Sequence, residues 1–398
     1  MTPPGSELGL SRRARAMPLS ATIKVSQAAA ALRASGVPVL DFSVGEPDQD
    51  TPTHVVAAGA RALAEGRTRY APPSGIPELR AAVAARYRED VGLDFAAEEV
   101  AISCGGKQAL FNVCQMLLDP GDEVIVPTPH WPTFPEAVRL AGGRPVFVTC
   151  RERDGFELRV ASIRRALGPR TRALIVNSPN NPTGAVVDAD QWLALGRLAQ
   201  KRGFTLIYDD TYAQLSYGRT STEVFAALRR TIPGRFVVVG TASKTYCMTG
   251  WRIGWTLGPR ALAEACAALA SHSTQSPATF AQYGALAALT GPQHGVAERA
   301  AEYRRRRDLI YRAVVAIRGV SCVEPAGAFY VFPNVKRFLS SRVPTSLALA
   351  SRLLADQQIA SVPGEGFGAP GYLRISFARP LAELEVGAGR IRRFLEGL

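Results

Sequence analysis

Lys244 is the residue of this sequence whose neighbours best suit it for covalent chemistry. It ends the run Gly240-Thr241-Ala242-Ser243-Lys244, and Arg252 follows eight residues later. A lysine ammonium ordinarily loses its proton near pH ~10.4, so it is a nucleophile at neutral pH only where burial or cationic neighbours disfavour its charge. Arg252 could supply such a neighbour, and its guanidinium could also anchor a phosphate.

A carboxylate precedes these residues at a position where it could meet a cation. Asp209 ends the apolar run Thr205–Tyr208, which predicts a buried strand, so its side chain should point into a crevice. An isolated buried carboxylate is costly unless it meets a cation, and a protonated pyridine nitrogen is one such cation. An ion pair with an arginine or lysine is the alternative, which we favour for Asp209 taken alone.

Three other loops that follow predicted strands contain groups suited to a flat, phosphorylated ring. Gly105-Gly106-Lys107 opens a predicted helix, whose first backbone N–H groups suit phosphate. Trp131 could stack on a planar ring, and the amide of Asn181 could bind a phenolate oxygen. Tyr212, three residues after Asp209, could donate to the same oxygen. Each group also has an ordinary explanation, such as core packing or turn chemistry.

The combination is more informative than any single residue. Five loops, each after a predicted strand, would supply phosphate donors, a stacking ring, an amide, a carboxylate and an amine. Ligands of open α/β sheets lie at the carboxyl ends of the strands, so these groups should converge there. Together they are the parts of a pyridoxal phosphate site, with Lys244 as the catalytic amine and Asp209 as the partner of the ring nitrogen.

The strands that must position these loops are short apolar runs that alternate with helical patterns. This alternation predicts an α/β fold with a mostly parallel sheet. The expected strands are Val100–Cys104, Glu123–Pro127, Arg144–Thr149, Ala173–Asn177, Thr205–Tyr208, Phe236–Gly240 and Arg252–Leu257.

Helical patterns lie between these strands. One begins at Pro77 and places Leu79, Val83 and Tyr87 on a single stripe, and a capping box of Asp188 with Gln191 predicts the start of another. An alanine-rich helix is expected from Ser26 to Ser35, where Gly36 should end it in the left-handed conformation.

The length of 398 residues and a change of pattern predict two domains. After about residue 290 the sequence predicts a long charged helix, Val296–Val315, followed by strands at Ala328–Phe332 and Gly371–Phe377. We therefore expect an N-terminal arm, a large cofactor-binding domain and a small α+β domain, at residues 1–16, at 48–290, and at 17–47 with 291–398.

Composition narrows the class of protein. With 47% hydrophobic and 20% charged residues, and without an apolar run of the ~20 residues that a membrane span needs, we expect a cytoplasmic protein that does not enter membranes. The six cysteines form no CxxC pair, so neither a metal nor a disulfide framework is expected. The net charge of +13 suggests nucleic-acid binding as a hypothesis. The basic residues are spread along the chain without a binding motif, however, so we do not expect the protein to bind nucleic acid.

The sequence resembles the class I aminotransferases of the aspartate aminotransferase family, which have fold type I of the pyridoxal phosphate enzymes. The resemblance runs from about Leu10 to the C-terminus. Its motifs are VGEPD at residues 44–48, YAPPSG at 70–75, GGKQALFN at 105–112, NSPNNPTG at 177–184 and MTGWRIG at 248–254.

The resemblance implies a role for each site residue. Lys244 would bind the cofactor covalently, Asp209 would pair with the ring nitrogen, and Tyr212 and Asn181 would bind the ring oxygen beneath a stacked Trp131. The phosphate would be held by Gly105, Gly106, Lys107, Thr241, Arg252 and, from the partner subunit of a homodimer, Tyr70. The α-carboxylate of the substrate would be bound by Arg374 and the backbone N–H of Gly45, with Asn181 and Trp131 beside it.

Substrate choice is inferred from two positions. Lys107 and Thr22 match residues that the prokaryotic aspartate and prephenate aminotransferases use for acidic side chains, which favours aspartate with 2-oxoglutarate. Prephenate or aromatic amino acids, and a C–S lyase reaction on the same fold, are the alternatives within the cofactor class. A basic binding protein without turnover is the alternative outside it.

Overall fold

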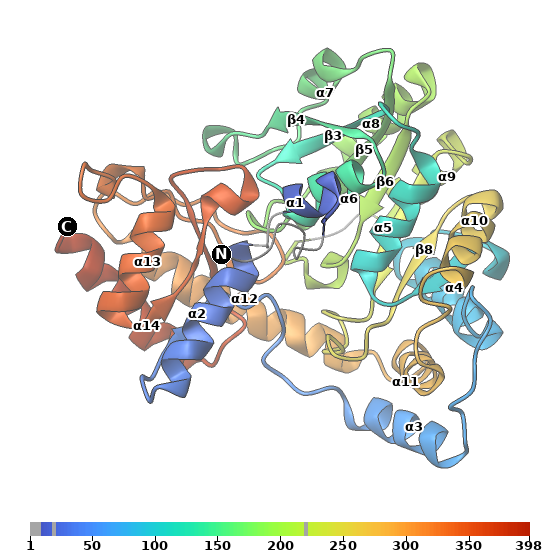
Figure 1. Ribbon diagram of the computed structural model, residues 1–398, viewed down its shortest axis with the longest axis horizontal. Coiled ribbons are helices and arrows are strands. Elements are labelled where there is room, and N and C mark those ends of the chain that lie inside the picture. Colours follow the sequence, from blue (N-terminus) through green and yellow to red (C-terminus); the bar gives the residue numbers. More distant parts are fainter. Residues whose placement is uncertain (1–8, 18–20, 219–221) are drawn as a thin grey trace, which may run out of the picture.

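The protein is described by a computed structural model that covers residues 9–17, 21–218 and 222–398 (Figure 1). Its main element is a seven-stranded sheet in the order β2-β8-β7-β6-β5-β3-β4. The strands are β2 (Val100–Ser103), β3 (Glu123–Thr128), β4 (Arg144–Thr149), β5 (Thr171–Asn177), β6 (Thr205–Asp209), β7 (Phe236–Thr241) and β8 (Gly254–Leu257). Only β8 runs against its neighbours among these strands, so the predicted mostly parallel α/β sheet is confirmed.

The strand ends differ from the expected ones by at most two residues. β8 begins at Gly254 rather than at Arg252, because Arg252 has a φ of 56° and cannot continue an extended strand. Cys104 likewise lies just outside β2.

Helices cover both faces of this sheet. Buried side chains of α4, α8, α9 and α11 pack on one face, and those of α5, α6 and α10 pack on the other. The helices around the sheet are α3 (Thr53–Ala64), α4 (Pro77–Val91), α5 (Gly106–Leu117), α6 (Thr133–Leu140), α7 (Val160–Ala166), α8 (Ala189–Arg202), α9 (Thr222–Thr231), α10 (Arg260–Ser271) and α11 (Thr279–Thr290). Leu79, Val83 and Tyr87 are buried from α4, as their spacing predicts.

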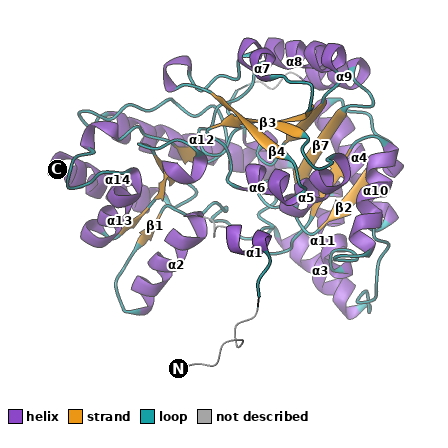
Figure 2. Cartoon of the chain, turned by 45° about the horizontal axis from the view of Figure 1, so that its top comes forward, coloured by secondary structure: helices purple, strands orange, loops and turns teal. Residues whose placement is uncertain are grey.

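A second group of elements lies beside the first (Figures 1 and 2). It has a three-stranded sheet in the order β11-β12-β9 and a separate two-stranded pair, β1-β10. Its strands are β1 (Leu40–Asp41), β9 (Tyr330–Val331), β10 (Ile359–Ala360), β11 (Val362–Pro363) and β12 (Leu373–Ser376). Its helices are α2 (Ala21–Ala34), α12 (His294–Val315), α13 (Ser346–Gln357) and α14 (Leu381–Glu396). The domain limits at residues 47/48 and 290/291 stay a prediction.

Three local expectations need correction. Within the expected N-terminal arm, Arg12–Ala16 forms a short helix, α1, capped by the Ser11 hydroxyl. The alanine-rich helix begins at Ala21 rather than Ser26, since the residues before Ser26 also tolerate helix, and Gly36 is left-handed as predicted.

The capping box at α8 forms only in part. Asp188 Oδ1 accepts a hydrogen bond from the Gln191 N–H at 2.8 Å. The Gln191 side chain turns away to donate to Glu157 and to accept from the Val160 N–H, so the reciprocal bond to Asp188 is not made. No helix within residues 9–17, 21–218 and 222–398 is both long and apolar enough to cross a bilayer.

Candidate active site

A cavity of about 300 Å³ lies where the carboxyl ends of β5, β6 and β7 meet the first turn of α5. Two side chains, Tyr330 and Arg374, enter it from the small sheet. Most of the predicted site residues line it. The lining residues are Ile23, Gly45, Gly106, Lys107, Trp131, Thr133, Asn177, Asn181, Asp209, Thr211, Tyr212, Thr241, Ser243, Lys244, Arg252, Tyr330 and Arg374.

Lys244 follows β7 in a loop and is almost fully enclosed. Its Nζ donates a hydrogen bond to the backbone carbonyl of Gly45 at 2.7 Å. Burial, together with the cations Arg252, Arg374 and Lys107, lowers the pKa of Lys244 to about 8, against an opposing contribution from Glu46. At this pKa roughly a tenth of the amine is unprotonated at pH 7, far more than for an ordinary lysine, which favours a role as nucleophile or base.

Asp209 is the last residue of β6 and is 4% exposed. Its Oδ1 accepts a hydrogen bond from the Thr211 N–H at 3.0 Å. Burial raises the pKa of Asp209 to about 6, although the bonds to Thr211 oppose the rise. A carboxylate in this position is incompletely compensated, so it suits a cationic group in the cavity, such as a protonated ring nitrogen.

A phosphate-sized cradle lies at the start of α5. Gly105 has a φ of 88°, and a Cβ built there would lie 2.2 Å from Arg252 Nη2, so only glycine allows this approach. Arg252 is held by the carbonyl oxygens of Thr249 and Cys104, at 2.7 and 3.3 Å. Its guanidinium and the positive end of α5 thus meet at one point, as an anion site requires.

Two hydroxyls complete the cradle. Thr241 Oγ1 lies 2.8 Å from Ser243 Oγ and donates to the Ile253 carbonyl at 2.9 Å. Both residues line the cavity beside Arg252. Hydroxyls, backbone N–H groups and a guanidinium are the donors that proteins use for phosphate.

Lys107 and Trp131 form the side of the cavity near α5 and α6. The Lys107 ammonium lies over the Trp131 ring, 5.2 Å from its centroid. Burial, followed by the charge of Arg252, lowers the pKa of Lys107. The pair places a cation and a flat aromatic surface on the same wall.

Arg374 lies on the wall of the cavity that faces Lys107 and Trp131, and its side chain is buried, with 2% of the residue exposed. Its Nη1 donates to Asn181 Oδ1 at 3.0 Å and its Nη2 to the Ser43 carbonyl at 2.6 Å. Its Nε is buried and has no hydrogen-bond partner among the described residues. The guanidinium lies 4.4 Å from the centroid of the Tyr330 ring, so it is held in place yet keeps donor capacity for an anionic ligand.

Tyr212 stands between the two walls. Its hydroxyl is 2.8 Å from the hydroxyl of Tyr330, and burial raises the pKa of Tyr212 well above its usual value. The phenol therefore stays protonated and can donate a hydrogen bond into the cavity.

Three of the predicted residues are not gathered by this cavity. Gly105 shapes the cradle without lining it, and Tyr70 is 91% exposed on the surface of the same chain. The side chain of Thr22 lies outside the part of the chain that the structure describes. Gly45 lines the cavity, but the contact it makes here is through its carbonyl, to Lys244, rather than through its N–H.

The sequence reasoning missed Tyr330, Ser243 and Asn177, which all line the cavity. Asn177 Oδ1 accepts from the Asn181 N–H at 2.8 Å and thereby shapes the loop that holds Asn181. Tyr330 carries a hydroxyl within the apolar run 328–332, and that polar atom in a buried strand is the signal that could have identified it.

The model of the family "Aminotransferase class I and II" matches residues 37–391. The chain belongs to the class I and II aminotransferases. It is 46% identical over 390 residues to the aspartate/prephenate aminotransferase of Thermus thermophilus, covering 97% of this chain and 99% of that protein. It is 40% identical over 388 residues to the aspartate aminotransferase of Geobacillus stearothermophilus, with the same shares covered.

Similarity to solved structures agrees with the assignment of the chain to this family of aminotransferases. The Thermus thermophilus aspartate aminotransferase with maleate superposes with a TM-score of 0.92 at 45% identity, covering 98% of this chain and all of that one. The aspartate aminotransferase from Rhizobium meliloti superposes with a TM-score of 0.92 at 36% identity, covering 98% and 99%. The family resemblance predicted from the motifs and the transaminase class of enzyme are therefore confirmed.

Metal ligands are a separate question for this aminotransferase. Among the residues that the structure describes, no group of three or more His, Cys, Asp or Glu side chains could hold a metal ion.

Proposed function

We propose that the protein transfers an amino group between aspartate and 2-oxoglutarate, as a homodimer with pyridoxal phosphate as its cofactor. The observation that carries the proposal is the placement of Lys244, Asp209 and Arg374 around one cavity. The Lys244 amine, with its lowered pKa, suits the cofactor aldehyde. The incompletely compensated Asp209 carboxylate suits the ring nitrogen, and the Arg374 guanidinium, which has spare donors, suits a substrate carboxylate.

The residues would hold the cofactor from three directions. Asp209 would compensate the ring nitrogen, and Tyr212 would donate to the ring oxygen. The cradle of Gly106, Thr241 and Arg252 would hold the phosphate. When bound, pyridoxal phosphate supplies an electron sink for the pair of electrons left when the substrate Cα loses its proton.

Lys244 would perform the proton transfers. Its lowered pKa makes the unprotonated form of Nζ accessible within a cavity that also contains Arg374, so it can take the proton from the substrate Cα and return one on the product side. Arg374 would orient the substrate by its α-carboxylate throughout. A second 2-oxo acid would reverse the steps, which predicts ping-pong kinetics.

Lys107 supports an acidic substrate side chain. It is the cation on the wall opposite Arg374, and its position over Trp131 keeps it within the cavity. A dicarboxylate could thus be held at both ends. The Thermus thermophilus relative is named for aspartate and prephenate, so prephenate, which also carries a second carboxylate, is the second candidate substrate.

The homodimer is proposed from the surface of the chain. Tyr70, for which the family resemblance implies a contact to the partner's phosphate, is 91% exposed here, and Val56 and Leu63 of α3 are each 47% exposed nearby in sequence. Mixing Lys244→Ala chains with Tyr70→Ala chains should restore about a quarter to a half of the activity if sites are shared between subunits. Absence of any recovery, with dimers shown by ultracentrifugation, would contradict shared sites.

A panel of amino acids tests the substrate directly. The protein loaded with pyridoxal phosphate would be mixed with aspartate, glutamate, arogenate, phenylalanine and alanine, and its spectrum would be recorded as the cofactor becomes the pyridoxamine form. Aspartate and glutamate should convert it fastest. Fastest conversion by arogenate would instead support the prephenate reaction, and release of pyruvate or ammonia without an acceptor would support the lyase. The cytoplasmic location stays a prediction.

A further inference from the structure

A second polar contact joins the two sheets outside the cavity. Glu152 begins a short 3-10 turn just after β4, the edge strand of the large sheet. Its carboxylate accepts hydrogen bonds from Ser321 Oγ at 2.5 Å, Asn334 Nδ2 at 2.6 Å and Tyr372 Oη at 2.8 Å. All three donors belong to the chain around the small sheet. Hydrogen bonds to an ionised group are roughly twice as strong as neutral ones, so this contact is a firm one.

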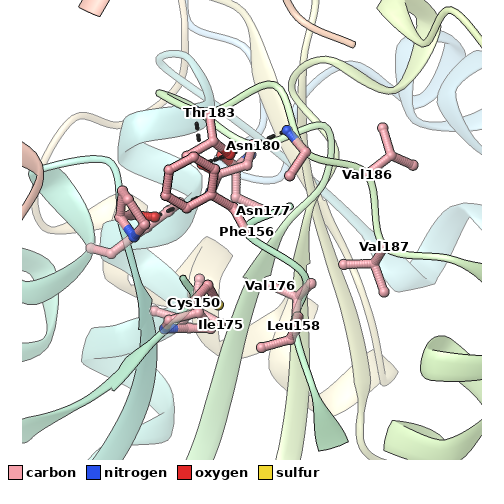
Figure 3. Close-up of a pocket in the computed structure, with 14 residues that line it drawn as sticks. Cys150, Phe156, Leu158, Ile175, Val176, Asn177, Asn180, Thr183, Val186 and Val187 are labelled. Atoms are coloured by element: carbon pink, nitrogen blue, oxygen red, sulfur yellow. Dashed lines mark hydrogen bonds between the residues drawn. The ribbon is translucent and has the colours of Figure 1, made fainter. Parts of the chain in front are cut away.

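An apolar contact lies next to it. The Phe156 ring packs edge-on against Phe332 and Tyr372, at 6.1 and 5.9 Å between centroids, and Phe332 stacks on Tyr372 at 4.9 Å. Phe156 has a φ of 58°, which is unfavourable for a residue with a Cβ and persists only where packing enforces it. Figure 3 shows the Phe156 ring beside Asn180 and Thr183 at a small pocket of about 40 Å³.

This double contact lies at the start of the strand that presents Arg374. Tyr372 directly precedes β12 and is bridged to Asn334, and Arg374 is two residues further along, so in this extended segment their side chains leave the same face, about 7 Å from each other. Leu373 leaves the opposite face into the core of the second group of elements. β12 is the central strand of its sheet. A tilt or shift of the strand at Tyr372 therefore moves Arg374 relative to the cavity.

We propose that Glu152 is a positioning residue for substrate recognition, because its grip on Ser321, Asn334 and Tyr372 fixes the strand from which Arg374 reaches the substrate carboxylate. Glu152 touches neither the cavity nor Arg374, so it acts through Tyr372. The inference rests on the proposed function only in that Arg374 binds a carboxylate.

Hydrogen exchange of the full-length protein tests the structural part without any turnover. In Glu152→Gln the side chain keeps its size but loses its charge, so its bonds to Asn334 and Tyr372 become neutral and weaker even when the amide oxygen faces these donors and the NH₂ group faces Ser321 Oγ. The amides of residues 372–377 should then exchange about tenfold faster, while those of β5 and β6 keep their rates. A uniform increase across the chain, or no change in residues 372–377, would overturn the proposal.

Steady-state kinetics test the functional part, with Glu157→Gln as the matched control. Glu157 lies on the same loop, but among the described residues its carboxylate bonds only to Gln191 and Arg159, on the side of the large sheet. Glu152→Gln should raise KM for both the amino acid and the 2-oxo acid about tenfold and change kcat less than about twofold. Glu157→Gln should leave both constants at the wild-type values. Equal KM values in the two variants would refute a positioning role.

Tyr372→Phe keeps the ring stack and removes only one of the three donors. It should reproduce about a third to a half of the rise in KM, and adding it to Glu152→Gln should cause less than the product of the two single effects, since one variant weakens and the other removes the same bond. Independent, multiplicative effects would contradict the proposed link. If the wild type showed no transamination, the proposed function would fail while the exchange result would still decide whether Glu152 holds β12.

Discussion

The two walls of the cavity differ in how their residues are held. On the large-sheet wall, Asp209 is the last residue of β6 and Lys244 lies in the loop just after β7. Asp209 is bonded to the nearby N–H of Thr211, whereas Lys244 is bonded to the carbonyl of Gly45, 199 positions away. On the small-sheet wall, Arg374 is bonded to Ser43 and Asn181, which are 331 and 193 positions away in sequence. The positions of Asp209 and Lys244 on the cofactor wall therefore follow from the ends of two strands, whereas the position of Arg374 on the substrate wall depends on how two sheets meet.

The comparison predicts different kinds of damage. A substitution on the large-sheet wall should remove chemistry, because its groups act on the cofactor and on protons. A substitution on the small-sheet wall should chiefly weaken substrate binding and orientation. Five variants test this difference, in descending order of expected effect.

Lys244→Ala should have the largest effect. The variant lacks the amine proposed to bind the cofactor covalently and to move the Cα proton, so kcat should fall by more than about 10⁴-fold and the yellow colour of the bound cofactor should be lost. Stopped-flow spectra and steady-state assays measure both. Lys201→Ala, on the exposed end of α8, is the control and should behave as wild type. Retention of turnover by Lys244→Ala would contradict the assignment of the catalytic amine.

Arg374→Lys should be next, with kcat/KM lowered about 100- to 1,000-fold, because an ammonium cannot make a bidentate contact and Asn181 Oδ1 loses its donor. The loss should be the same for every amino acid, since all carry an α-carboxylate. Isothermal titration with a dicarboxylate inhibitor would give the binding share of the loss. A loss confined to kcat would show that this wall does not act through binding.

Lys107→Ser should lower kcat/KM about 10- to 50-fold for acidic substrates and less than about threefold for aromatic ones. The reason is that the ammonium lies on the large-sheet wall yet is proposed to bind a side-chain carboxylate. This variant tests whether substrate binding is confined to the small-sheet wall or is shared with the large-sheet wall. Equal losses with aspartate and phenylalanine would show that Lys107 has no part in reading the substrate side chain.

Tyr330→Phe removes one hydroxyl from the small-sheet wall. Its partner, the Tyr212 hydroxyl, would lose a 2.8 Å contact, and the ring would still cover Arg374. We expect kcat/KM to fall about three- to tenfold, with no change in the free energy of unfolding beyond about 1 kcal/mol. Kinetic assays and urea titrations, run in parallel, separate the effect on activity from the effect on stability. A loss as large as that of Arg374→Lys would mean that Tyr330 takes a direct part in the reaction.

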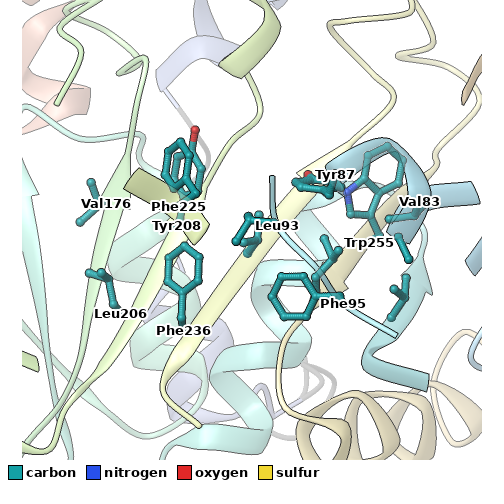
Figure 4. Packing of buried hydrophobic residues seen from close by; sticks show 14 of the residues in the cluster. Val83, Tyr87, Leu93, Phe95, Val176, Leu206, Tyr208, Phe225, Phe236 and Trp255 are labelled. Carbon is teal, nitrogen blue, oxygen red and sulfur yellow. The ribbon is translucent and has the colours of Figure 1, made fainter. Parts of the chain in front are cut away.

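Asp210→Asn should affect activity least and report on burial behind the large-sheet wall. Asp210 is partly buried and accepts a hydrogen bond from Tyr87, whose hydroxyl also accepts one from Trp255 at 2.9 Å (Figure 4). Burial raises the pKa of Asp210 to about 8, and the neighbouring Asp209 adds to the rise. Between pH 4 and pH 8 the folded protein therefore holds a proton that the unfolded chain has lost.

The retained proton sets the direction in which the free energy of unfolding changes with pH. Because the folded state binds more protons in this window, the stability contributed by the Asp210 proton is complete at low pH and is lost as pH rises towards 8. Asn cannot ionise, so the stability of Asp210→Asn relative to wild type should grow with pH, by at most ~1.4 kcal/mol per unit. Urea unfolding of the cofactor-free proteins at several pH values measures it. A difference independent of pH would show that Asp210 ionises normally.

Much of the large-sheet wall was predictable because each of its residues follows an apolar run. Asp209 after Thr205–Tyr208 and Lys244 after Phe236–Gly240 needed only the rule that ligands lie at the carboxyl ends of parallel strands. The seven strands were found within two residues of their ends for the same reason, since buried parallel strands are continuous apolar segments.

The small-sheet wall was predictable only in part. Alternation along residues 372–377 separates Arg374 from the core side chains, and the family resemblance supplied its role. Nothing in the sequence indicated that Tyr330 would cover the guanidinium or that Glu152 would hold Tyr372, because these contacts join segments that lie far apart in the chain.

The sequence by itself thus determined which residues follow a buried strand and what chemical groups they carry. Only the tertiary structure decided how far those groups are desolvated and which distant partners they meet. The physical reason is that periodicity is a property of neighbouring residues, whereas the lowered pKa of Lys244 and the placement of Arg374 arise from charges and packing contributed by the whole fold.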